Sequence, residues 1–279
     1  MVAQRIGENL AFVNWVVLAA LAVGTYAVVL AGRFGPVSAT RGYLGFTAIV
    51  AAVAAGLAWL ADGALPATTT AGSPVAPDPA FAGLRAGSLA VLAGVAFLHG
   101  IVLLRGGRAP LLALVGGGAG ALALAAAALG WGGDPAGVAV RLVQLLVVAL
   151  ATGGALGTML LGHWYLVTPK LPEAPLVLVA RLLLAVVVAQ ALLFAASMAL
   201  GGGTGGGPLS PLTGEWALFV WLRLLVGLAF PLVVTWAAIQ TARTRSMESA
   251  TGLLYIDIGA IGAGTILAAG LWFGAGLVV

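Results

Sequence analysis

Eight long apolar segments dominate this chain of 279 residues. They cover residues 9–32, 42–64, 86–104, 111–131, 137–167, 176–200, 215–241 and 249–277. A helix rises about 1.5 Å per residue, so each segment is long enough to cross most or all of a hydrocarbon core of about 30 Å. Backbone groups in lipid must be satisfied within the segment. The sequence therefore predicts an all-α integral membrane protein with eight transmembrane helices.

The composition excludes several classes of function. Only 7% of residues are charged and 62% are hydrophobic, far too few charges for the surface of a soluble domain. The net charge of +4 includes no basic run with interleaved aromatic residues, so no nucleic-acid partner is expected. The absence of cysteine excludes disulfides, thiolate metal sites and thiol nucleophiles. The expected partners are membrane lipid and other subunits of a membrane complex.

The basic residues predict the orientation of the chain. The turns after the first, third, fifth and seventh segments hold most of them: Arg33, Arg41, Arg105, Arg108, Lys170, Arg243 and Arg245. The N-terminus and the other loops hold only Arg5 and Arg85. The positive-inside rule then places those four turns in the cytoplasm and both termini on the extracytoplasmic side. The cysteine-free, Ala/Leu/Val/Gly-rich composition is typical of a bacterial protein, so we expect the cytoplasmic (inner) membrane of a bacterium.

A shift of 133 residues aligns landmarks in the two halves of the chain. It matches Ala22, Gly24 and Thr25 with Ala155, Gly157 and Thr158, and the turn residue Pro36 with Pro169. A constant offset is typical of duplication, although helices of this composition also match by chance. We predict a 4+4 arrangement of parallel four-helix repeats, residues 1–133 and 134–279.

Two histidines lie at about the same predicted depth. His99 precedes Arg105 by six residues and His163 precedes Lys170 by seven, which places both about 10 Å inside the cytoplasmic boundary. An ionisable group at that depth usually faces a protein interior and serves a function. Imidazoles from two helices at equal depth can ligate one haem iron. His99 and His163 are therefore the predicted axial ligands of a haem b.

Further polar groups lie on the fifth and eighth segments. Arg141, Gln144, Thr152, Met159 and His163 fall within an arc of about 100° and are expected to face the bundle interior. The plainer interpretation is helix packing, with Arg141 extending outward. Asp257 lies near the midplane and needs a proton or a cation. Arg181 and Arg223 are its candidate ion-pair partners, and ion pairing and a proton relay stay equally open. Asp62 and Asp78 are expected to be solvated loop charges.

Packing also has sequence signals. Gly116, Gly117, Gly118 and Gly120 predict close helix contact, as do Ala260, Gly264 and Ala268 beside Asp257. Pro231 is expected to kink the seventh segment and free a backbone carbonyl.

These residues favour a membrane subunit of a respiratory or photosynthetic electron-transfer complex that binds haem b, quinone or both in the cytoplasmic half of the bilayer. Tyr165, Tyr255 and Asp257 are the candidate quinone residues, and Arg181 is the candidate partner of a haem propionate. In layout, the two bundles resemble the quinone-binding anchor subunits of the polysulfide-reductase type. The chain alone is not expected to be an enzyme. Two alternatives stay open: a proton-coupled small-molecule transporter, and a non-catalytic structural or assembly subunit.

Overall fold

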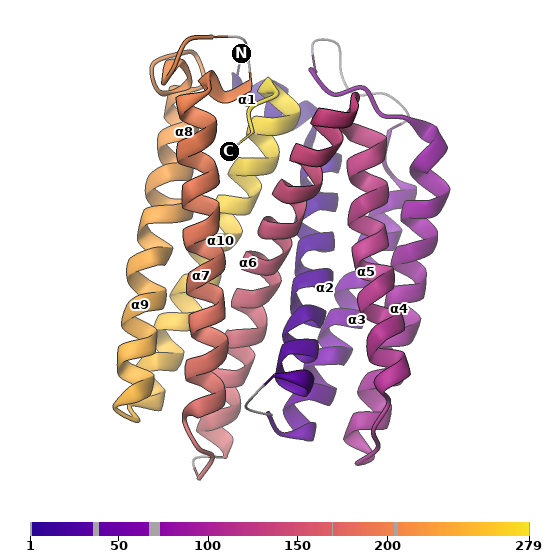
Figure 1. Cartoon of the computed structure of the whole chain (residues 1–279), viewed down its shortest axis with the longest axis vertical. Helices are drawn as coiled ribbons and strands as arrows, with labels where there is room; N and C mark the ends of the chain where they lie inside the picture. Colours follow the sequence, from indigo (N-terminus) through magenta and orange to yellow (C-terminus); the bar gives the residue numbers. More distant parts are fainter. Residues whose placement is uncertain (1, 36–38, 67–72, 169, 204–205, 279) are drawn as a thin grey trace.

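The computed structural model describes residues 2–35, 39–66, 73–168, 170–203 and 206–278. All regular structure in these ranges is helical (Figure 1). The helices are α1 (Val2–Glu8), α2 (Leu10–Phe34), α3 (Arg41–Gly63), η1 (Pro79–Phe81), α4 (Ala82–Leu104), α5 (Pro110–Trp131), α6 (Pro135–Val167), α7 (Ala174–Ala199), η2 (Gly201–Gly203), η3 (Ser210–Leu212), α8 (Ala217–Leu224), η4 (Leu225–Ala229), α9 (Phe230–Arg243) and α10 (Met247–Ala275).

The described residues form eight helical segments that are long and apolar enough to cross a membrane, which confirms the predicted all-α architecture and number of spans. Most boundaries lie within a few residues of those expected from the sequence. The third segment begins earlier, at Pro79, because the carboxylate of Asp78 accepts a hydrogen bond from Ala80 N at 2.9 Å and starts the helix. The sequence analysis missed α1, a short helix that precedes the first membrane-spanning segment.

The helices pack as two groups of four segments. In the first, α2, α3, α4 and α5 contact one another in chain order, and α2 closes against α5. In the second, α6, α7, α9 and α10 do the same, and α6 closes against α10. Both marked termini lie at the same end of the bundle (Figure 1). This arrangement accommodates two repeats, but the duplication itself stays a prediction, and its two turn prolines, Pro36 and Pro169, lie outside the described residues.

The two groups meet mainly along α2 and α6, where glycine permits direct backbone contact. A Cβ atom on Gly24 would lie 1.8 Å from the carbonyl oxygen of Ala149, and one on Gly153 would lie 2.2 Å from Thr25 N. Lipid tails are as apolar as leucine, so helices in a membrane associate through such close packing and through hydrogen bonds rather than through the hydrophobic effect. One such hydrogen bond crosses this interface: Thr25 Oγ1 donates to Gly153 O at 3.3 Å.

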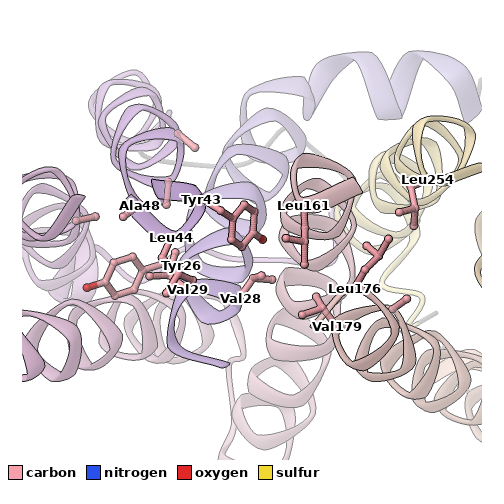
Figure 2. Close-up of a cluster of buried hydrophobic side chains, with 14 of the residues drawn as sticks. Tyr26, Val28, Val29, Tyr43, Leu44, Ala48, Leu161, Leu176, Val179 and Leu254 are labelled. Atoms are coloured by element: carbon pink, nitrogen blue, oxygen red, sulfur yellow. The ribbon is translucent and has the colours of Figure 1, made fainter. Parts of the chain in front are cut away.

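Buried tyrosines join helices in the adjoining core. Figure 2 shows Tyr26 and Tyr43 among the apolar side chains of this cluster, with Leu161 and Leu176 on its other side. The hydroxyl of Tyr43, on α3, donates to Gly157 O on α6 at 2.7 Å. Gly116 of α5 lies directly against the Tyr26 ring, where a Cβ would come within 2.6 Å. The predicted close contact is therefore with α2 at Gly116, Gly117 and Gly120, whereas a Cβ on Gly118 would meet no atom within 4 Å.

Asp62 is buried, and the prediction that it is a solvated loop charge was wrong. Its Oδ1 accepts a hydrogen bond from Arg85 Nε at 2.5 Å, and the guanidinium group lies 4.9 Å from the ring centre of Trp131. The last turn of α3 and the first turn of α4 face each other, so the two opposite charges compensate each other's loss of solvent. Asp78, in contrast, is exposed, as expected.

Candidate functional site

His99 is a buried side chain on α4 that is held by α2. Its Nδ1 lies 2.9 Å from the hydroxyl of Tyr26. The same hydroxyl lies 3.1 Å from Leu112 O on α5. The His99–Tyr26 pair therefore links three helices of the first group. The sequence analysis did not identify Tyr26, although a tyrosine within an apolar segment usually needs a partner for its hydroxyl.

His163 has a different environment. It lies near the end of α6, is exposed, and its Nδ1 lies 3.2 Å from the hydroxyl of Tyr255 on α10. The Tyr255 side chain is itself 48% exposed. This pair is accessible from the side of the bundle, so lipid or another subunit can reach both groups.

The structure does not bring the two histidines together. His99 faces Tyr26 on one side of α2, while α6, which carries His163, packs against the other side through Gly24. Figure 1 shows α2 between α6 and the α3–α5 group. The prediction that the two imidazoles are neighbours was therefore wrong. Equal depth along two helices does not fix the direction in which each ring points. These two rings do not fit a shared haem iron.

Two other predicted site residues also stand apart. The hydroxyl of Tyr165 donates to Pro172 O in the α6–α7 turn, so this side chain stabilises the turn. Arg181 is exposed on α7 and forms no ion pair or hydrogen bond with the described residues.

Asp257 is fully buried in α10. Thr235 Oγ1, on α9, donates to its Oδ2 at 2.6 Å, while its Oδ1 has no partner among the described residues. Neither arginine considered from the sequence forms an ion pair with this carboxyl group. Arg223 lies instead beside Gly264, about two turns further along α10.

Arg223 is explained by the irregular helix that carries it. This side chain is 2% exposed, and its Nη1 donates to Gly227 O at 3.1 Å. Pro231 has no N–H to offer the carbonyl group four residues before it, and that carbonyl belongs to Gly227. The π-helix η4 spans the same stretch. The predicted free carbonyl is therefore present, and a buried guanidinium group binds it.

Arg141 also points inward, not outward as the packing interpretation suggested. It is 9% exposed, its guanidinium carbon lies 3.6 Å from the ring centre of Trp272, and its Nη1 donates to Gln144 Oε1 at 2.9 Å. A cation on an aromatic face is stabilised by the ring quadrupole. The predicted interior stripe on α6 is thus buried at Arg141, Gln144 and Thr152, and exposed at His163.

Arg223 and Gln144 both line a pocket of about 300 Å³ between α6, α7 and α8. Gln190 of α7 is the third polar residue in its wall, and the rest of the lining is apolar: Ala139, Val140, Val143, Val147, Val148, Leu193 and Val278. The exposed Val140, Val143 and Leu193 place its opening on the side of the bundle. The sequence analysis missed Gln190, although it is the only amide side chain in its span.

The described residues contain no group of three or more histidine and acidic side chains that could hold a metal ion. No family model matches the chain, no curated protein is detectably similar to it, and no solved structure matches it. The functional assignment therefore depends on the geometry of the chain itself. The pocket between α6, α7 and α8 has a largely apolar wall with three polar side chains, which suits a membrane-soluble ligand.

Proposed function

We propose that this chain is a membrane subunit of an electron-transfer complex and binds a quinone in the pocket between α6, α7 and α8. The proposal depends on one observation: the pocket wall is apolar and opens toward the side of the bundle, and it contains the polar side chains of Gln144, Gln190 and Arg223. Ligand pockets commonly pair apolar walls with a few polar groups that orient the ligand.

The residues fit the two parts of a quinone. Val140, Val143 and Leu193 offer apolar surface to a ring and an isoprenoid tail that enter from the bilayer. The carbonyl oxygens of a quinone accept hydrogen bonds, and Gln190 and Arg223 carry N–H groups at the pocket wall. Arg223 Nε has no partner among the described residues, so one buried donor is left for a ligand.

The charge of the pocket favours an electron-rich oxygen. Arg223, the one charged residue in the pocket wall, forms no ion pair with a carboxylate of the described residues. Hydrogen bonds from a charged donor are stronger than neutral ones, and more so where water is scarce. The pocket lies in the half of the bundle that contains the chain termini, away from His163 and Tyr255. The proposal therefore keeps the quinone predicted from the sequence and moves its site.

The proposal predicts that quinone co-purifies with the protein and that the pocket binds it. Quinone would be extracted from the purified protein, identified by chromatography, and a short-chain quinone would be titrated into quinone-depleted protein. Val143→Trp, which fills the pocket, should weaken binding at least tenfold. Val53→Trp is the matched control, because Val53 is exposed on α3 and does not line the pocket. Equal binding by both variants would refute the proposed site.

The transporter and the structural subunit are the competing proposals. Buried Asp257 favours a proton-coupled transporter, for which substrate counterflow in liposomes should depend on that residue. A structural subunit should co-purify with its partners and contain no quinone. An absorption spectrum of the oxidised and reduced protein tests for haem, and a Soret band that is lost on replacement of either histidine would contradict the geometry described above.

A further inference from the structure

Asp257 is the one acidic side chain in the described part of the chain that is completely buried without a cationic partner. Thr235 Oγ1 lies 2.6 Å from its Oδ2, and its Oδ1 is shielded from solvent with no hydrogen-bond partner among the described residues. The residue lies ten positions into α10, about 15 Å from the start of that helix. It is therefore deep in the membrane-spanning part of the bundle.

No cation on the surrounding helices pairs with Asp257 in the described structure. α10 packs against α1, α2, α6, α8, η4 and α9. The cationic or titratable side chains on these elements and on α10 are Arg5, Glu8, Tyr26, Arg33, Arg141, His163, Tyr165, Arg223, Arg243, Glu248 and Tyr255. None of them forms an ion pair or a hydrogen bond with Asp257 in the described structure. The apolar cluster of Leu183, Val187 and Ile261 lies in the same helix group.

The other buried aspartate of the chain shows the contrast. Asp62 receives two hydrogen bonds from Arg85, at 2.5 and 3.4 Å, so its negative charge is compensated where it lies. Asp257 receives one hydrogen bond, from a neutral hydroxyl group. An ionised carboxylate in an apolar environment costs several kcal/mol unless it is paired, and an unpaired group takes up a proton instead.

We propose that Asp257 is a proton-binding site inside the membrane, with Thr235 as the side chain that orients its carboxyl group. The bound proton neutralises the acid, and Oδ1, the buried oxygen without a hydrogen-bond partner, is the atom that carries it. Asp257 does not line the quinone pocket. Arg223, which does, lies beside Gly264, and Gly264 is about two turns from Asp257 along α10.

Other hydroxyl groups lie along the same helix but do not form a continuous path. Thr251 is buried about 9 Å from Asp257 along α10, and Thr265, which bonds Thr152 of α6 at 2.6 Å, lies about 12 Å away in the other direction. Each gap exceeds a hydrogen bond, so the acid is isolated in this conformation. Thr235 follows Pro231 by about one turn on α9, which begins directly after the π-helix η4.

The same substitution at the two buried aspartates gives a matched test. Asparagine resembles a protonated aspartate in shape and charge. Asp257→Asn should therefore unfold at the same denaturant midpoint as the unmodified protein. Asp62→Asn leaves Arg85 without a counter-charge and should lower the midpoint clearly. An equal loss at both positions, or failure of Asp257→Asn alone to fold, would overturn the proposal.

Infrared spectroscopy tests the unmodified protein directly. The chain contains four aspartates, so carbon-13 labelling of the aspartate carboxyl groups isolates a small set of bands. We expect a labelled protonated carboxyl band at neutral pH that is lost in Asp257→Asn and that exchanges slowly in D₂O, because the site is isolated. Carboxylate bands alone from the labelled aspartates would refute the proposal. The quinone titration does not affect either outcome, so the two proposals can fail separately.

Discussion

Replacement of Gly24 by alanine tests the contact on which the two halves of the bundle depend. A Cβ at this position would lie 1.8 Å from the carbonyl oxygen of Ala149, and Cβ atoms essentially never approach another heavy atom within 3.0 Å. The α2 and α6 backbones must therefore move apart by more than 1 Å. The obstacle is a backbone atom of a helix, so no side-chain rotation can relieve it.

The cost follows from the kind of contact that is lost. Overpacking of a core typically costs about 1–3 kcal/mol when side chains can adjust. Here two helices must separate, and in lipid no hydrophobic effect compensates for the lost contacts. We expect a loss of about 3 kcal/mol, which is roughly a hundredfold change in the ratio of folded to unfolded protein.

The measurement is unfolding by a denaturing detergent in mixed micelles, followed by tryptophan fluorescence. Gly94→Ala is the matched control, because a Cβ on this α4 glycine would meet no atom within 4 Å. Alanine is the better helix former by about 1 kcal/mol, so the control should be neutral or slightly stabilising. If Gly24→Ala were as stable as Gly94→Ala, the close α2–α6 interface described here would be wrong.

Three further predictions concern single contacts. Asp62→Asn should lower the free energy of unfolding by about 3–5 kcal/mol, because it leaves Arg85 buried without its partner. Adding Arg85→Met to this variant should restore most of the loss in the same unfolding assay. No recovery in the double variant would contradict the ion pair. Tyr26→Phe should cost about 1–3 kcal/mol, because it leaves a buried ring nitrogen or carbonyl group without its hydrogen bond, and an unchanged unfolding midpoint would count against it. The cysteine-free chain also allows a test of orientation with a membrane-impermeant maleimide. Ala76→Cys should react in intact cells, whereas Lys170→Cys should react only after lysis. The reverse pattern would contradict the topology predicted from the basic residues.

The sequence predicted the helices well because each one carries its own signal. The number of residues needed to cross the bilayer, the apolar composition and the turn residues determine where a span begins and ends, without reference to the rest of the fold. Small residues were also informative: Gly116 of α5 marked the contact with Tyr26, and Gly264 marked the contact with η4. Boundaries shifted only where a local side chain intervened, as at Asp78.

Pairing between helices was harder to predict, and the histidines show why. Counting residues from a charged turn gives the depth of a side chain, since every residue adds the same rise. It does not give the rotation of that helix against its neighbours or the identity of those neighbours. His99 and His163 agree in predicted depth, yet His99 is buried beside Tyr26 of α2, while His163 is exposed beside Tyr255 of α10.

The depth of two side chains predicts their pairing when they lie on consecutive helices. Asp62 lies in the last turn of α3 and Arg85 in the first turn of α4, and the loop between these helices returns the chain to the same end of the bundle. Consecutive helices are usually neighbours, so two opposite charges at matching depths on either side of one loop should have been expected to pair. Asp257 has no such partner at its depth on α9, where Thr235 faces it instead. A buried acid is therefore stabilised by a cation where a neighbouring helix offers one at the same depth, as at Asp62. Where none is offered, as at Asp257, a bound proton removes the charge instead.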